Sequence, residues 1–138
     1  MEFENAVGLS RKSLDKLYAA GSYLEYPNGK YKGRPLFFIS NLKLTPLNFL
    51  VNILWKGKEF NSTGRLLSNK ILFLNLFYGR YYLGKSKFDS TSTIILDYSK
   101  SSIVGFFVKD EIRKIGDNLF LGKAYVFGKF ICYFLLKN

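Results

Sequence analysis

The sequence predicts a mainly β protein: an antiparallel β-barrel of about eight strands, with a short N-terminal helix and a helical lid. Aromatic residues make up 18% of the chain and it has 12 glycines, a composition that favours strands and turns over a helical bundle. From about residue 55 onward, short apolar segments follow one another with connections too short for crossovers, so neighbours should pair antiparallel. A sheet of that many twisted strands usually closes on itself.

Length and composition predict one domain over residues 1–138. The chain has 138 residues and is 48% hydrophobic, which is enough to bury a core without metals or disulfides and excludes a disordered chain. Its one cysteine, Cys132, lies in the apolar run "GKFICYFLL" and is expected to be a packed thiol.

The first predicted element is a helix over residues 10–21, "SRKSLDKLYAAG". Ser10 or Ser13 can cap it, and Gly21 suits a left-handed end. Residues 30–39 follow as a strand that has one polar face.

Two prolines constrain the next elements. Pro35 implies that the first strand pairs on one side only, or bulges there. Pro46 follows Thr45, a good N-cap, and predicts a helix over residues 44–55, "LTPLNFLVNILW". Because this helix is apolar almost all round, it is the candidate lid.

Alternating apolar segments bounded by turn residues predict the remaining strands. "GDN" and "FGK" are expected to be hairpin turns. The expected strands cover residues 55–60, 70–79, 80–88, 92–99, 103–115, 118–126 and 129–137.

Several catalytic arrangements are excluded by residue type. The chain has no His and one Cys, which rules out Ser-His-Asp and Cys-His sites and His-liganded metals. No strand, glycine loop and helix occur in the order that cradles phosphates. We therefore expect no cofactor and no metal, and any chemistry must come from carboxylates, Tyr, Lys and Arg.

Asp110 is the main candidate for such chemistry. In "IVGFFVKDEIRKI" the alternation places Asp110 on the apolar face with Ile112, pointing inward, while Glu111 and Arg113 point outward as a solvated pair. An inward carboxylate is costly unless it is paired or protonated. Asp110 is therefore either a buried anchor bound by a Lys, a Tyr or backbone amides, or a group that orients a ligand or moves a proton.

Other candidates lie near predicted strand ends. Asp97 either caps the turn after its strand, which the pattern favours, or joins Asp110 inside, while Tyr98 and Tyr125 are polar-tipped rings that could help an acid or base. Trp55, just after the lid, is expected to be a core plug or to close the barrel mouth, with Lys58 near the entrance. The candidate catalytic pair is Asp110 and Tyr98, and the candidate ligand-binding residues are Trp55, Lys58, Asp97, Tyr98, Asp110, Arg113 and Tyr125.

With "GKYKGRPL", "LWKGKEF", "TIILDYS" and "KDEIRKIGDNLFLGKAYV" in order, the chain resembles a family of small uncharacterised bacterial proteins with lipocalin-like (calycin-like) barrels. The resemblance covers nearly the whole chain and is strongest over residues 110–113 and 119–123. It implies a barrel fold and no established activity. Asp117 and Asn118 stand where that family would have a Pro-Gly-like turn.

Three functions remain open. The first is binding of a small hydrophobic or amphipathic, fatty-acid-like molecule in a barrel cavity. The second is a small cofactor-independent enzyme, an isomerase, dehydratase or hydrolase, with Asp110 as acid or base. The third is binding of an anionic membrane or nucleic acid by a chain of net charge +11. Nucleic acid is disfavoured, because the lysines are scattered beside turn glycines rather than clustered.

The same sequence bears on location. "MEFENAV" lacks the basic and apolar regions of a signal peptide, and no uncharged apolar run reaches the roughly 18 residues that span a bilayer. The cytoplasm is the expected compartment, with secretion without a cleaved signal left open.

Overall fold

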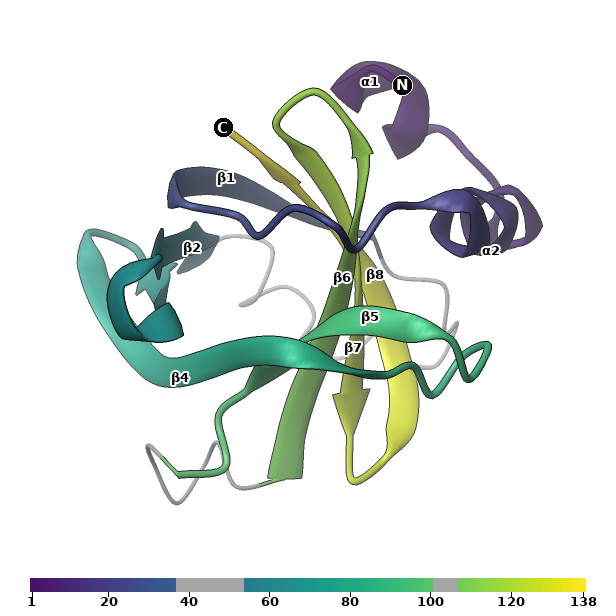
Figure 1. Ribbon diagram of the computed structural model, residues 1–138. Helices are drawn as coiled ribbons and strands as arrows, with labels where there is room; N and C mark the ends of the chain where they lie inside the picture. The colour runs from purple at the N-terminus through teal and green to yellow at the C-terminus, as the bar shows by residue number, and fades with distance from the viewer. Residues whose placement is uncertain (37–53, 101–106) are drawn as a thin grey trace.

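The computed structural model describes residues 1–36, 54–100 and 107–138 and confirms the predicted fold class. Eight antiparallel strands form a closed barrel in chain order, with the last strand paired to the first (Figure 1). The strands are β1 (Gly29–Leu36), β2 (Trp55–Asn61), β3 (Leu66–Ile71), β4 (Leu74–Lys85), β5 (Ser92–Asp97), β6 (Val108–Gly116), β7 (Leu119–Val126) and β8 (Lys129–Lys137), with a 3-10 turn η2 (Thr63–Arg65) between β2 and β3.

Two helices, α1 (Phe3–Val7) and α2 (Arg11–Ala20), precede the barrel and lie against its outer wall (Figure 1). Ser10 is the N-cap of α2, and its hydroxyl accepts from the Ser13 amide at 3.2 Å. The predicted left-handed end at Gly21 is wrong, because its φ is −69°. The glycine is needed for space instead: a Cβ there would lie 2.8 Å from the Cβ of Arg113.

The first strand pairs on both sides, so the prediction of pairing on one side only is wrong for the strand as a whole. β1 pairs with β2 through Lys32, and Pro35 pairs on the other side, with Phe134 of β8. The predicted lid, residues 44–55, lies almost wholly outside the described residues. Trp55, its last residue, belongs to β2.

The predicted boundaries of β3 and β4 are wrong. Strands were expected over residues 70–79 and 80–88, but the hairpin turn falls at Leu72–Phe73, between β3 and β4. Gly79 lies inside β4, where a Cβ would come 2.7 Å from the carbonyl oxygen of Asp97. The glycine therefore permits close approach of β5 and does not mark a turn.

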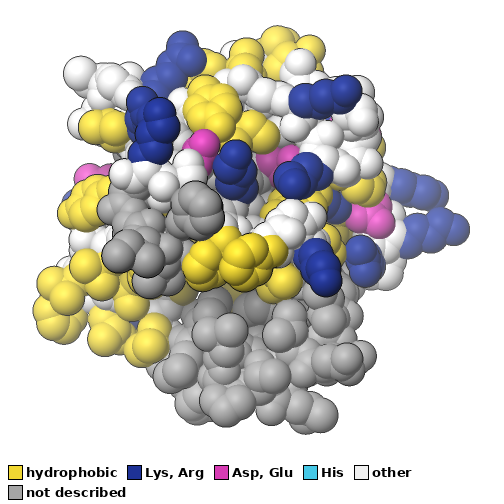
Figure 2. Space-filling view, turned by 90° about the horizontal axis from the view of Figure 1, so that it is seen from below, with side chains coloured by type: hydrophobic (Ala, Val, Ile, Leu, Met, Phe, Trp, Pro, Cys, Tyr) yellow, Lys and Arg dark blue, Asp and Glu magenta, His cyan; other side chains and the backbone are white. Residues whose placement is uncertain are grey.

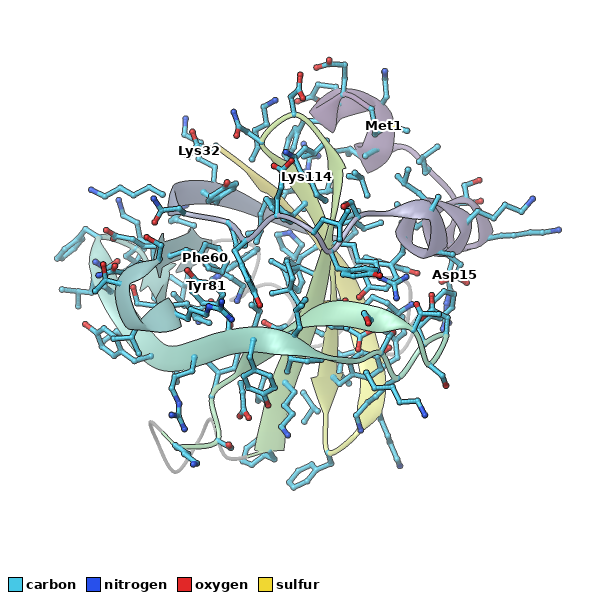
Figure 3. All side chains as sticks on the ribbon, viewed as in Figure 1. Met1, Asp15, Lys32, Phe60, Tyr81 and Lys114 are labelled. Atoms are coloured by element: carbon cyan, nitrogen blue, oxygen red, sulfur yellow. The ribbon has the colours of Figure 1, made fainter. Side chains whose placement is uncertain are left out.

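The barrel interior is packed with side chains. Rings meet edge-on, with 5.7 Å between the centroids of Tyr31 and Phe60 and 5.4 Å between those of Phe60 and Tyr81. Figure 3 labels Phe60 and Tyr81, which lie side by side. The interior of the described part of the barrel is thus lined by side chains that pack against one another. This inner cluster draws on all eight strands and comprises Tyr31, Phe60, Leu67, Tyr81, Ile94, Leu96, Tyr98, Ile112, Phe120, Phe134 and Leu136.

A second cluster lies outside the barrel wall, between the helices and the strands β7 and β8. Leu14 and Tyr18 of α2 are fully buried there against Leu121 and Leu135. The helices therefore cover one outer face of the barrel and leave its interior to the strands. No helix in the described ranges is long and apolar enough to cross a membrane.

Candidate functional site

Three polar or charged side chains meet around Lys58, inside one end of the barrel. The Lys58 ammonium donates to the side-chain oxygen of Asn69 at 2.7 Å, to the Tyr98 hydroxyl at 2.6 Å and to Asp110 Oδ2 at 3.0 Å. Tyr98 in turn donates to Asp110 Oδ2 at 3.0 Å. All four side chains are buried, so the cluster is a charged network within an otherwise apolar interior.

A β-bulge in β2 brings Trp55 and Lys58 to the same side of the wall. Regular alternation would place residues three apart on opposite faces, but the register of β2 shifts between Trp55 and Gly57. Gly57 has φ 146°, and a Cβ there would lie 1.9 Å from the carbonyl oxygen of Tyr31. With both side chains inside, the Trp55 indole donates to Asn69 at 3.1 Å.

The contacts of Asp110 are those of a buried anchor. An ammonium has three N–H groups, and those of Lys58 are directed at acceptors from β3, β6 and the end of β5. Burial and the Asp110 charge hold the pKa of Tyr98 well above its usual value. Burial, followed by Asp110, also raises the pKa of the Cys132 thiol to about 12. The network links the strands and leaves Lys58 without a spare donor.

Asn69 was missed in the sequence. In "LLSNKI", Asn69 lies on the same face of the strand as the apolar residues Leu67 and Ile71. The period-two pattern therefore indicates a polar side chain that points inward. Its amide also donates to the carbonyl oxygen of Phe77 at 3.1 Å.

Asp97 faces outward and caps the turn after β5, as the pattern favoured. It accepts from the Ser99 amide at 2.9 Å and from the Tyr82 hydroxyl at 2.8 Å, and Lys109 lies 3.8 Å away. Burial acts to raise the pKa of Asp97, but the hydrogen bonds from Ser99 and Tyr82 outweigh it and lower the pKa. Asp97 therefore does not join Asp110.

Glu111 and Arg113 point outward, as predicted, but the expectation of a solvated pair is wrong. Their exposed fractions are 2% and 1%, because α2 and residues 86–91 cover them. Arg113 binds Asp89 with two hydrogen bonds of 2.7 and 2.8 Å instead of pairing with Glu111. It lies on the opposite side of the wall from Asp110.

Glu111 and Lys123 make polar contacts that hold α2 against the barrel, and the sequence predicted neither role. Glu111 accepts from Ser86 at 2.6 Å and from the Tyr18 hydroxyl at 3.1 Å. Lys123 donates to Tyr133 at 2.7 Å and lies 3.4 Å from Asp15 of α2. These polar contacts depend on α2 folding back over β6 to β8, which no local pattern indicates.

Two adjoining hollows open on the outer wall, around Tyr125. The first, about 220 Å³, lies over β4 to β7, and the second, about 300 Å³, extends toward the β7–β8 turn. They share Lys87, Lys109 and Tyr125, so we treat them as one outer groove. Its lining also includes Tyr82, Gly84, Lys85, Ile95, Asp110, Glu111, Phe107, Phe127 and Gly128.

The outer groove combines cations with aromatic rings. Lys85, Lys87 and Lys109 are exposed, and the Lys87 ammonium lies 6.0 Å from the centre of the Tyr125 ring. Phe107 and Phe127 stack at 4.5 Å at its far end. In the view from below, Lys and Arg side chains are spread over the displayed surface (Figure 2).

The acidic side chains beside the outer groove already accept hydrogen bonds from neighbouring residues. Glu111 accepts from Ser86, Tyr18 and the Lys87 amide, the last at 3.1 Å, and Asp97 from Ser99 and Tyr82. Of the predicted ligand-binding residues, the groove holds Tyr125 and part of Asp110. Within the described ranges, no three acidic or cysteine side chains lie close enough together to hold a metal ion.

By fold, the protein is a closed eight-stranded antiparallel barrel with helices on its outer wall. It is similar to a crystal structure of a protein from Thermomonospora curvata, with a TM-score of 0.65 and 19% sequence identity over 94% of this chain and 88% of that one. At this identity the likeness shows the fold alone. No protein-family model matches the sequence, and no curated protein matches it. Membership of a lipocalin-like family therefore stays a prediction.

Proposed function

We propose that the protein is a non-catalytic binder of a small amphipathic anion, a fatty-acid-like carboxylate in class, and that the ligand lies in the outer groove. One observation carries this proposal: the described molecule is hollow where three exposed lysines surround a floor of Tyr125, Tyr82 and Ile95. Ligand sites are typically apolar hollows with a few well-placed polar groups.

The groove supports this function better than the barrel interior does. Interior side chains from all eight strands are in contact, and the Lys58 ammonium already has three acceptors. Oδ2 of Asp110 likewise accepts from Lys58 and Tyr98, contacts that favour a structural role for this carboxylate. In the groove, the ammonium groups are exposed and their positive charge favours a carboxylate.

The test compares two probes with the same alkyl chain and opposite charge. Dodecanoate, below its micelle concentration, should give a saturable heat of binding in isothermal titration calorimetry, and dodecyltrimethylammonium should give none. The Lys87→Ala/Lys109→Ala double variant should bind dodecanoate about tenfold more weakly, since an exposed charge contributes up to about 1 kcal/mol.

The matched control is Lys30→Ala/Lys32→Ala. These two lysines are also exposed, but they lie on β1, across the barrel from β5 (Figure 3). They should leave dodecanoate binding unchanged. Equal binding of the two probes, or equal loss in the two double variants, would show non-specific attraction and reject the groove as the site.

A further inference from the structure

The β3–β4 hairpin exposes six large apolar side chains within seven residues, interrupted only by Asn75. Phe73 at its tip is 82% exposed. Contiguous apolar patches of this kind are uncommon on a soluble monomer and mark interaction surfaces. Figure 2 shows hydrophobic side chains gathered on the side of the molecule where β2 to β4 lie. We call these residues the hairpin patch: Leu72, Phe73, Leu74, Leu76, Phe77 and Tyr78.

The turn itself is built from residues that a turn does not favour. Two-residue hairpin turns usually contain Gly, Asn or Asp, which tolerate positive φ. Here Leu72 has φ 56° and is followed by Phe73. The β6–β7 turn places Asn118 (φ 49°) at such a position, and the β7–β8 turn follows Phe127 (φ 50°) with Gly128 (φ 76°), whereas the β3–β4 turn contains no Gly, Asn or Asp. Leu72 and Phe73 thus make a poor turn but present two large apolar side chains to the outside.

The charges around the hairpin patch are mainly positive. Lys56 and Lys70 are exposed on the strands beside it, and Lys70 is paired with Asn75 across the hairpin. The acid near them, Glu59, accepts from Asn75 at 3.3 Å. The whole chain carries a net charge of +11, so an anionic partner fits this surface.

We propose that the hairpin patch inserts into the surface of an anionic lipid membrane. A narrow turn with an exposed Phe can enter the headgroup region to a depth of about 5–10 Å. Tyr78 is placed for the interface that aromatic residues with a polar tip prefer, and Lys56 and Lys70 would contact the lipid phosphates. A second copy of the chain is the competing occupant.

Vesicle co-sedimentation of the full chain tests the proposal. The protein should bind phosphatidylcholine vesicles containing phosphatidylglycerol and should not bind vesicles of pure phosphatidylcholine. Phe73→Glu should weaken binding at least tenfold, while Leu24→Glu should not. Leu24 is a matched control because it is 80% exposed and precedes β1, at the end of the barrel opposite the β3–β4 turn.

Insertion also has a spectroscopic signature. Trp55 is the protein's single tryptophan, so Phe73→Trp adds one reporter at the tip. After subtraction of the wild-type spectrum, its emission should shift to the blue with anionic vesicles and be quenched by brominated lipid.

Three results would overturn the proposal: no vesicle binding, equal binding by Phe73→Glu and wild type, or a Phe73→Trp emission that vesicles leave unchanged. A dimer in analytical ultracentrifugation that Phe73→Glu converts to a monomer would assign the hairpin patch to a second copy instead. Matching thermal unfolding curves for Phe73→Glu and wild type show that the variant remains folded.

Discussion

The ammonium of Lys58 and the carboxylate of Asp110 lie 3.0 Å apart inside the barrel, although 52 residues separate them in the chain. The pair joins β2 to β6, two strands that are not neighbours in the sheet. Because the charges are desolvated, each depends on the other, and several measurable consequences follow.

Removing one partner should destabilise the barrel more than removing both. Asp110→Ala leaves the Lys58 charge buried without its counterion and should lower the free energy of unfolding by about 3–5 kcal/mol. The double variant Lys58→Met/Asp110→Leu replaces the pair with apolar side chains and should recover most of that loss. Urea unfolding measures both; a double variant as unstable as the sum of the two single variants would contradict the prediction.

The Arg113–Asp89 pair should make stability depend on acid. Its hydrogen bonds hold the pKa of Asp89 well below the usual 3.8. Since the carboxyl is more acidic in the folded state, its contribution is fully present above about pH 4 and is lost as the pH falls below that value. The stability difference between wild type and Asp89→Asn should therefore shrink from pH 6 to pH 2 in urea unfolding. A difference independent of pH would argue against this linkage.

Cys132 should be inert in the folded protein. It is 8% exposed, and burial raises the pKa of its thiol to about 12, so little thiolate exists at pH 8. Reaction with a disulfide reagent should proceed at the rate of barrel opening and become fast in urea. Rapid labelling of the native protein at pH 8 would show that the thiol is accessible. Asp110→Ala, which loosens the same end of the barrel, should label faster.

A substitution at Leu72, in the strained β3–β4 turn, should stabilise the protein. Leu72→Asn places a residue that tolerates positive φ at φ 56° and should raise the free energy of unfolding by about 1 kcal/mol. The converse change, Asn118→Leu at φ 49°, should lower it by a similar amount. Thermal unfolding of the two variants compares them directly. If Leu72→Asn is more stable yet binds anionic vesicles less well, the apolar side chain at this strained position serves membrane attachment.

The fold was predictable because period-two alternation directly reports which face of a strand is buried. The inward direction of Asp110 and the outward direction of Glu111 and Arg113 follow from it, and the structure has both. The hairpin turn at Leu72–Phe73 was not predictable, because two apolar residues do not indicate a turn. Gly79 indicated a turn, but it lies inside β4. The burial of Glu111 and Arg113 was missed because the cover comes from α2, nearly a hundred residues earlier.

By itself, the sequence determined that this is a basic, aromatic-rich antiparallel barrel without His-based chemistry, and it marked Lys58, Tyr98 and Asp110 as residues of interest. Only the tertiary structure decided that these three meet, because the bulge at Gly57 turns Lys58 inward beside Trp55. It also decided that rings from the described strands pack in the interior, and that a groove opens on the outer wall around Tyr125. The physical reason is that alternation specifies a face, whereas pairing register, bulges and helix docking specify which side chains share it.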